Sequence, residues 1–387
     1  MRTFMLISAL CVVSGAAAFG ARSLLRGGRP EARRAAAVGG AEAAPAAPPK
    51  QAQWRQQSVP LGRNASIIVF GPGGSAVAAG VGTLLLSRDD GRTWTELRGG
   101  PGDYRLTTDG GASYSPSGGV AGAATPGRVS VRDLCGVDSA VIAPSGRLYM
   151  RTSCEGAAQV WSVPLGDDSA PWHVVTFGSP GGDRDRGVAS PVGSFVLAGS
   201  RVLTEANRRD RTVILTTDDD GATWTSFWKT SFFGSGFIAF DFIDADNGWM
   251  LLGDGELSRT GDGGRTWTRV AALPEEWAED ASAMKFADAR NGYIVGDRGL
   301  VLATADGGAT WHRRPTGVDT WFFTVAVADG GRKVWAAGDS RAVLESKDGG
   351  GSWSSIHIEA LMNVYHRLTL KGDTAWVVSQ DVIHHSD

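Results

Sequence analysis

Carboxylates recur in this sequence at a fixed place in a short repeated motif. The motif consists of Ser or Thr, any residue, Asp, any residue, Gly, any residue, Thr or Ser, and Trp. Its Asp and Trp residues are Asp89 and Trp94, Asp219 and Trp224, Asp262 and Trp267, Asp306 and Trp311, and Asp348 and Trp353. Such carboxylates could act as general acids or bases, bind a metal ion, or accept backbone hydrogen bonds in a turn.

The spacing of the motif favours the third of these roles. The last four motif tryptophans are separated by 43, 44 and 42 residues, so the motif marks an internal repeat. In each copy the Asp side chain can accept backbone N–H groups, the Gly allows a positive φ, and the Trp can bury its ring between neighbouring hairpins. We therefore predict that the five carboxylates are structural.

Other catalytic or metal-binding patterns are missing from the sequence. The six histidines have neither helical nor Cys-x-x-Cys spacing, and His384 and His385 are neighbours in a predicted strand, where they point to opposite faces. The innermost predicted strands offer few carboxylates beyond Asp241 and Asp288, which fall at the end nearest the Asp motifs. The sequence thus predicts no catalytic residue, no metal site and no cofactor.

Each motif closes a longer unit that contains four short strands, as in residues 237–267 and 284–311. Four strands make one blade of a β-propeller. Between Trp94 and Trp224 we predict a degenerate repeat whose last strand begins at Trp172, together with a Gly-rich insertion at residues 98–128.

The two ends of the chain complete the predicted ring. The sequence stops inside a motif at Ser386 and Asp387, and residues 54–59 can supply the strand that this last repeat lacks. The predicted fold is all-β: a seven-bladed β-propeller over residues 52–387, with the ring closed by an N-terminal strand that joins the C-terminal blade.

The amino-terminal region has a different composition. Residues 4–21 are apolar, follow Arg2 and end in small residues, so residues 1–21 are predicted to be a signal peptide or an uncleaved signal anchor. Residues 22–51 are rich in Ala, Pro, Gly and Arg and form a predicted disordered linker. We expect an exported protein, periplasmic or extracellular or tethered to the membrane, in which Cys135 and Cys154 could form a disulfide or remain two thiols.

The repeats resemble those of a known family. The units GWMLLGDGELSRTGDGGRTW, GYIVGDRGLVLATADGGATW and VWAAGDSRAVLESKDGGGSW are similar to repeats of the Ycf48/Hcf136-like propellers, named for photosystem II assembly factors. This resemblance implies a non-catalytic accessory protein that helps a membrane or envelope complex to assemble. The motif, or Asp-box, is shared with sialidases and other BNR-repeat proteins. The alternative is therefore a BNR-type glycoside hydrolase or carbohydrate-binding propeller.

A protein partner is expected on the rim opposite the Asp motifs. A net charge of −3 and the lack of a dense Lys/Arg run exclude nucleic acid as the obvious ligand, and we expect a monomeric propeller. Aromatic and arginine side chains are common anchors of protein interfaces. The candidate partner-binding residues are Arg208, Arg209, Arg211, Trp277, Arg298, Trp321, Phe322 and Arg341.

Overall fold

The computed structural model places most of the region between residues 50 and 385. It describes residues 50–52, 55–58, 65–97, 99–107, 125–134, 136–154, 157–177, 195–207, 211–221, 224–231, 237–339, 343–356, 368–379 and 382–385. The predicted signal segment at residues 1–21 and most of the predicted linker lie outside these residues. No helix in the described ranges is long and apolar enough to cross a membrane.

The described strands form seven β-sheets, numbered here in chain order. Sheet 1 contains β3 (Ala65–Phe70), β4 (Ala76–Gly80), β5 (Thr83–Ser87) and β6 (Thr95–Glu96). Sheet 2 contains β7 (Gly99–Thr107), β8 (Thr125–Ser130), β9 (Gly136–Ile142), β10 (Arg147–Cys154), β11 (Ala157–Pro164) and β12 (Trp172–Phe177). Sheet 3 contains β13 (Val196–Ala198), β14 (Arg201–Asn207), β15 (Arg211–Thr217) and β16 (Thr225–Ser231).

The remaining sheets follow the same plan. Sheet 4 contains β17 (Phe237–Phe242), β18 (Gly248–Leu252), β19 (Glu256–Thr260) and β20 (Thr268–Ala272), and sheet 5 contains β21 (Ala281–Phe286), β22 (Gly292–Gly296), β23 (Val301–Thr304) and β24 (His312–Arg313). Sheet 6 contains β25 (Phe322–Ala328), β26 (Lys333–Gly338), β27 (Val343–Ser346), β28 (Ser354–Ile356) and β1 (Lys50–Ala52). Sheet 7 contains β29 (Leu368–Lys371), β30 (Thr374–Ser379), β31 (Val382–His385) and β2 (Arg55–Ser58).

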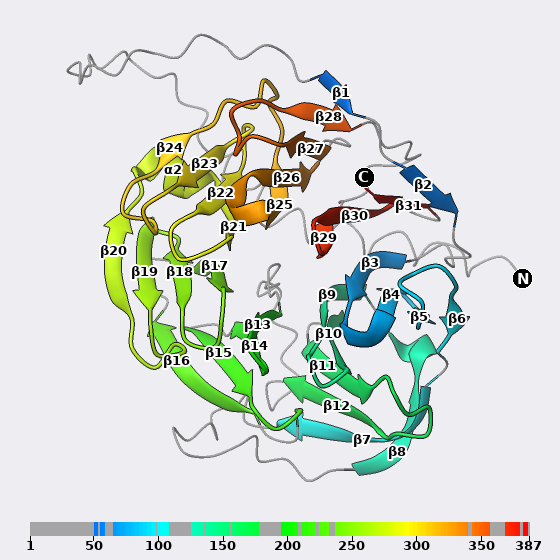
Figure 1. Cartoon of the computed structure of the whole chain (residues 1–387). Helices are drawn as coiled ribbons and strands as arrows, with labels where there is room; N and C mark the ends of the chain where they lie inside the picture. The colour runs from blue at the N-terminus through cyan, green and yellow to red at the C-terminus, as the bar shows by residue number, and fades with distance from the viewer. Residues whose placement is uncertain are drawn as a thin grey trace, which may run out of the picture.

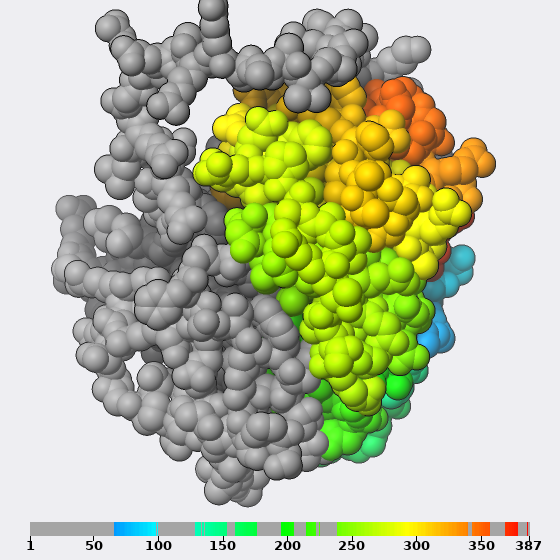
Figure 2. All heavy atoms as spheres, turned by 90° about the vertical axis from the view of Figure 1, so that its left-hand side faces the viewer, coloured from blue at the N-terminus to red at the C-terminus, as the bar shows by residue number. Residues whose placement is uncertain are grey.

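The sheets surround a common centre, which defines an all-β propeller (Figure 1). The innermost strands of neighbouring sheets contact each other in the order β13, β17, β21, β25, β29, β3 and β9. The short helix α2 (Glu275–Asp280) connects sheets 4 and 5, and the 3₁₀ turns are η1 (Pro72–Gly74), η2 (Val131–Asp133) and η3 (Asp329–Gly331). At the side of the ring, sheets 4 and 5 form one continuous surface (Figure 2).

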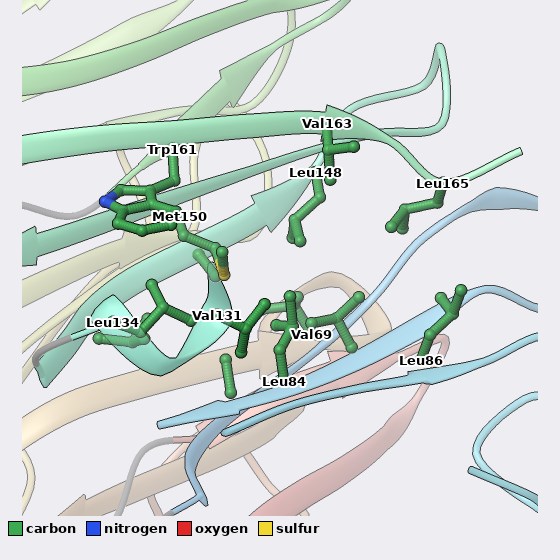
Figure 3. Close-up of a cluster of buried hydrophobic side chains, with 14 of the residues drawn as sticks. Val69, Leu84, Leu86, Val131, Leu134, Leu148, Met150, Trp161, Val163 and Leu165 are labelled. Carbon is green, nitrogen blue, oxygen red and sulfur yellow. The ribbon is translucent and has the colours of Figure 1, made fainter. Parts of the chain in front are cut away.

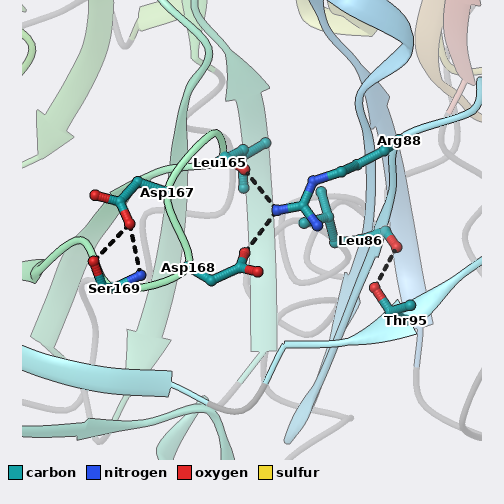
Figure 4. Close-up of polar contacts among 7 residues, drawn as sticks. All are labelled: Leu86, Arg88, Thr95, Leu165, Asp167, Asp168 and Ser169. Carbon is teal, nitrogen blue, oxygen red and sulfur yellow. Dashed lines mark hydrogen bonds and ion pairs between the residues drawn. The ribbon is translucent and has the colours of Figure 1, made fainter.

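Apolar side chains fill the spaces between neighbouring sheets. Between sheets 1 and 2, Leu84 lies opposite Leu148 and Met150, and Leu86 lies opposite Leu165 (Figure 3). Polar contacts add to this packing at the edge of the same interface. The Arg88 guanidinium donates to the Leu165 carbonyl oxygen at 3.1 Å and to the Asp168 carboxylate at 2.6 Å (Figure 4). Each sheet therefore depends on its neighbours to bury both of its faces.

Two strands near the amino end join the last two sheets. β1 pairs in parallel with β28, and β2 pairs antiparallel with β31, with Gln57 opposite Ile383. Residues 55–58 therefore lie where the sequence predicts a closing strand, whereas Trp54 is outside the described residues. Lys50 and Gln51 belong to β1, although the sequence analysis assigns them to the linker.

The insertion and the degenerate repeat lie in sheet 2. Its strand β12 begins at Trp172, as predicted. Residues 99–107 and 125–130, within and next to the predicted insertion, form β7 and β8 at the outer edge, and β7 pairs in parallel with β12. The insertion therefore widens this sheet.

Candidate functional site

The turns between strands lie on two opposite rims of the ring. Backbone hydrogen bonds between turns show which turns share a rim. On one rim, the amide of Gly263 in an Asp motif donates to the carbonyl oxygen of Asp246 in the first turn of the same sheet, at 2.9 Å. On the other rim, the amide of Leu273, in the connection to the next sheet, donates to the carbonyl oxygen of Gly255, also at 2.9 Å. We call these the Asp rim and the connector rim.

The Asp motif is a hydrogen-bonded turn in which the carboxylate is fully engaged. Asp262 Oδ1 accepts from the Thr260 hydroxyl and the Thr266 amide, both at 2.9 Å, and Oδ2 accepts from the Thr266 hydroxyl at 2.6 Å. The Thr260 hydroxyl in turn accepts from the Gly264 amide at 2.9 Å. The same bonds recur at Asp89, Asp306 and Asp348. At Asp219 the described part of the turn has the bond from Thr217.

These bonds act on the acidity of the carboxylates. The side chain and the amide of Thr266 lower the pKa of Asp262 to about 2, and equivalent bonds from Thr93 and Thr310 lower the pKa values of Asp89 and Asp306 to about 2. A general acid needs a pKa near the working pH. The Asp turns are therefore poorly suited to proton donation.

The lowered pKa of Asp262 predicts that the stability of the fold decreases in acid, and that substitution of Asp262 weakens this pH dependence. Because the pKa of Asp262 is depressed in the folded state, its contribution to stability is present above the unfolded value near 3.8 and is lost as the pH falls toward 2. Between pH 4 and 2, the free energy of unfolding of the Asp262→Asn variant should therefore depend less steeply on pH than that of the wild type. The difference in slope corresponds to the uptake of at most one proton on unfolding. Denaturant titrations at several pH values measure this slope, with Asp254→Asn on the connector rim as the control. An unchanged slope for Asp262→Asn would contradict the prediction.

The motif tryptophans lie between sheets. Trp224, Trp311 and Trp353 are buried, and Trp94 and Trp267 are half-buried. Each packs into the apolar cluster between its own sheet and the preceding one. Trp267, for example, contacts Phe242 edge-on, with ring centroids 6.1 Å apart.

Only part of the predicted partner-binding set can be placed. Arg208, Arg209 and Arg341 lie outside the described residues, and of Arg211 only its backbone in β15 is described. Phe322 does not fit the prediction, because its side chain is fully buried at the interface of sheets 5 and 6. β25 has a register irregularity between Phe322 and Thr324, and the neighbouring Phe323 is half-exposed.

The other three predicted residues lie at or near the connector rim of sheets 4 to 6. Arg298 is an exposed turn residue with φ of 52°, and its guanidinium donates to the Asp280 carboxylate at 2.5 Å. Burial raises the pKa of Asp280, an effect that the bond from Arg298 partly offsets. Trp277 is half-buried on α2, where it packs against the cluster between sheets 4 and 5.

Trp321 is anchored across two sheets. Its indole N–H donates to the Ser282 hydroxyl at 2.7 Å, and its ring lies against Phe323 with centroids 4.5 Å apart. Ser282 is the second residue of β21, and Trp321 immediately precedes β25. The indole therefore bridges the innermost strands of sheets 5 and 6. No sequence motif links Ser282, Phe323 and Asp280 to their partners, so the sequence alone does not predict these three residues.

The arrangement at this rim is suited to recognition. The Arg298 guanidinium is hydrogen-bonded to Asp280, and the partly exposed Trp321 indole is hydrogen-bonded to Ser282. Both side chains therefore have a defined position before any ligand binds. Nearby, Pro274, Glu275, Glu276 and Glu279 line an open depression beside α2. Within the described ranges, no three His, Cys, Asp or Glu side chains lie close enough to hold a metal ion.

Asp241 and Asp288, the two carboxylates that the sequence places on or next to the innermost strands, both accept hydrogen bonds from the protein. Asp241 is buried, with Oδ1 accepting from Lys285 Nζ at 2.6 Å and Oδ2 accepting from the Phe286 amide at 2.7 Å. Asp288 Oδ1 accepts from the amides of Arg290 and Asn291. Burial would raise the pKa of Asp288, but the bonds from Asn291 and the backbone outweigh it and lower the pKa. Asp241 thus bridges sheets 4 and 5, and Asp288 closes a turn.

The sheets and the two rims define a β-propeller (Figure 1). Residues 263–364 match the family described as photosynthesis system II assembly factor YCF48. This match confirms the resemblance to Ycf48-like propellers that the repeats indicate. The match covers the end of the Asp turn and the strand β20 in sheet 4, all of sheet 5, and the strands β25 to β28 of sheet 6. A search of curated protein sequences finds no match to the chain.

Solved structures share the fold at low identity. YCF48 bound to a D1 peptide is 15% identical, with a TM-score of 0.58 over 89% of this chain and 100% of the other. YCF48 from Cyanidioschyzon merolae is 15% identical, with a TM-score of 0.54 over 86% of this chain and 98% of the other. The WD40 β-propeller domain of Doa1 is 11% identical, with a TM-score of 0.55 over 87% and 96% of the two chains.

Proposed function

We propose that this chain is a non-catalytic, Ycf48-like binding propeller that holds a segment of a membrane or envelope protein during assembly. The observation that carries the proposal is the connector rim of sheets 5 and 6, where Arg298 and Trp321 are held in place by Asp280 and Ser282. Arginine and tryptophan are enriched among the residues that dominate binding energy. A preorganised pair loses little side-chain entropy on binding.

The engagement of the carboxylates supports this function over glycoside hydrolysis. Hydrolysis of a glycosidic bond needs two carboxyl groups about 5 to 10 Å apart, one of them with a raised pKa. Asp241 is occupied by Lys285 and Phe286, and the bonds around Asp288 lower its pKa. Both carboxylates stabilise the ring in this interpretation.

The proposed architecture is a seven-bladed ring closed by residues 55–58. Support comes from the pairing of β2 with β31 and from the contact of β29 with β3, which brings sheet 7 against sheet 1. Trp376 in β30 packs with Ile68 and Leu85 of sheet 1. The Asp turns act in this ring as structural turns between the third and fourth strands of their sheets.

The proposed location is outside the cytoplasm, free or tethered to the membrane by residues 1–21. The apolar composition of residues 4–21 and the assembly role named for the matched family support this location. A peptide of D1, the ligand named in the solved YCF48 complex, is the first partner to test.

Binding to a fluorescent D1 peptide and capture of proteins from the native membrane fraction test the function together. We expect Arg298→Ala and Trp321→Ala each to weaken binding about tenfold or more, because truncating an anchor residue costs about 2 kcal/mol. The melting temperature of Arg298→Ala should change little, since this side chain is exposed at the rim. Trp321→Ala also removes the bond to Ser282, so its binding is measured well below its own melting temperature. Arg265→Ala on the Asp rim is the matched control, because Arg265 is also exposed and, among the described residues, donates only to the Asp262 carbonyl oxygen.

The two assays separate the partner from the surface. The wild type could capture membrane proteins but not bind the D1 peptide, while Arg298→Ala and Trp321→Ala lose this capture. That result would support an assembly propeller whose partner is not D1. Equal capture by the wild type, Arg298→Ala and Trp321→Ala would show that the connector rim of sheets 5 and 6 is not the binding surface.

A further inference from the structure

Sheet 7 is packed less deeply than its neighbours in the part that the structure describes. Its innermost strand β29 has no buried residue, whereas β25 in sheet 6 and β3 in sheet 1 each bury several. The buried side chains of sheet 7 in these ranges are Ala375, Trp376 and Val377, which are consecutive in β30. Polar contacts therefore have a larger share in holding sheet 7 than in holding the other sheets.

The turn between β29 and β30 carries charges to the sheets on both sides. Lys371 ends β29, and its Nζ lies 3.1 Å from Asp90 Oδ1 in the Asp turn of sheet 1. Asp373 follows two residues later, and its Oδ2 lies 4.0 Å from Nζ of Lys333 at the start of β26 in sheet 6. One hairpin turn thus forms an ion pair of opposite polarity with each neighbouring sheet.

Aromatic rings hold the Lys371 ammonium group in addition to the carboxylate. Its Nζ lies 5.5 Å from the ring centroid of Phe70, which ends β3, and 6.0 Å from that of Trp376 in β30. The two rings contact each other with centroids 4.9 Å apart. A cation near aromatic rings at such distances is attracted by their electrons. Lys371 therefore joins sheet 7 to sheet 1 through both its charge and its position beside these rings.

The backbone of Asp90 indicates that its carboxylate is important. Asp90 has a φ of 64°, in the left-handed region that favours glycine. Its amide donates to the Gly74 carbonyl oxygen at 2.8 Å, a bond that glycine could form equally well. The side chain is what aspartate adds at this position. Glycine with positive φ stands there in the Asp turns of sheets 4, 5 and 6, as Gly263, Gly307 and Gly349.

A second aspartate at the same position has the same use. Asp220, in the Asp turn of sheet 3, has a φ of 56°, and its Oδ1 accepts from the Ser145 hydroxyl at 2.7 Å in the first turn of sheet 2. Both aspartates thus reach the first turn of an adjacent sheet. We propose that Lys371 and Asp373 form an electrostatic latch on the Asp rim, and that its release lets sheet 7 open locally while the other sheets stay folded.

The exposure of the latch makes it sensitive to salt. The side chains of Lys371 and Asp90 are 34% and 45% exposed, so dissolved ions can screen their attraction. Apolar packing between the other sheets is not screened in this way. Ionic strength would therefore control the opening of the ring at sheet 7.

Hydrogen–deuterium exchange of the full chain, followed by mass spectrometry of its peptides, tests the latch. The exchange rates are compared at about 0.01 M and about 1 M sodium chloride. We expect the amides of β29 and β30 to exchange about fivefold faster at high salt, and those of β22 and β23 in sheet 5 to be unaffected. An unchanged rate in sheet 7, or equal acceleration in both sheets, would overturn the proposal.

Two substitutions release the latch without salt. Lys371→Met removes the charge but keeps an unbranched stem beside the rings, and Asp90→Gly removes the carboxylate while relaxing the left-handed backbone. At low salt each variant should exchange β29 and β30 about fivefold faster than the wild type, and high salt should add little. The double variant should exchange no faster than Lys371→Met alone, because the ion pair is already broken. Wild-type exchange in Lys371→Met would overturn the proposal.

Asp220→Gly is the matched control, because it removes the equivalent aspartate between sheets 2 and 3. It should leave the exchange of β29 and β30 as in the wild type, and acceleration equal to that of Asp90→Gly would contradict a local latch. Asp373→Asn tests the pair with Lys333 and should also speed the exchange of sheet 7. An unchanged rate in Asp373→Asn would contradict the role of Asp373 in the latch.

Discussion

Deletion of residues 50–58 is expected to lower the melting temperature by about 10 °C or more and to cause aggregation. The deletion removes β1 and β2, which pair with β28 and β31. Both partner strands would become sheet edges with unpaired backbone groups, and such edges favour pairing between molecules. Thermal unfolding followed by circular dichroism, together with light scattering, measures both effects.

Deletion of residues 27–48 is the matched control. It removes more residues but none of the described strands, so the melting temperature should stay close to that of the wild type. If both deletions melt like the wild type, residues 50–58 do not hold the ring closed. If the deletion of residues 50–58 lowers the melting temperature as expected, separate deletions of residues 50–52 and 55–58 would show how much each strand contributes.

Trp249→Ala is expected to destabilise the fold by about 3 to 5 kcal/mol, the usual cost of truncating a buried aromatic side chain. Trp249 is fully buried, and its ring stacks on Phe286 with centroids 3.8 Å apart and an interplanar angle of 8°. Its indole N–H donates to the Gly307 carbonyl oxygen at 2.9 Å, and the Arg259 guanidinium lies 5.1 Å from the ring centroid. One side chain thus joins sheet 4 to the first strand and the Asp turn of sheet 5.

Trp249→Phe separates the two contributions. Phenylalanine keeps most of the stacking but leaves the Gly307 carbonyl without its donor, so we expect a smaller loss, about 1 to 2 kcal/mol. Urea titrations give the free energy of unfolding of both variants. If Trp249→Ala lowers the free energy of unfolding no more than Trp249→Phe does, the stacking contributes little to the interface of sheets 4 and 5.

The Asp turns were predictable because their bonds are local. The Thr260 hydroxyl, the Asp262 carboxylate and the Thr266 amide lie within seven residues, so a motif of eight letters contains every donor and acceptor. The strands around them follow from the same repeat, since each unit alternates apolar runs with turn residues. Period and motif were therefore sufficient to predict an all-β propeller.

The connector rim was less predictable because its contacts cross between sheets. The sequence favoured Trp321 and Phe322 as a pair of surface aromatics. In the fold, the start of β25 turns Phe322 into the space between sheets 5 and 6 and leaves Phe323 beside Trp321. A bulge in β25 and the packing of the neighbouring sheet decide which of the two adjacent phenylalanines is buried. The residues next to Phe322 in the sequence indicate neither the bulge nor the packing.

The sequence by itself determined the repeat, the turn chemistry and the Ycf48-like character of the chain, because each rests on residues close together along it. Only the tertiary structure decided that residues 50–52 and 55–58 pair with two different sheets, that Asp241 bonds Lys285 across an interface, and that Trp321 is anchored by Ser282. These contacts join residues up to some 330 positions apart. Their formation depends on how the sheets pack around the centre, and no short stretch of sequence encodes that packing.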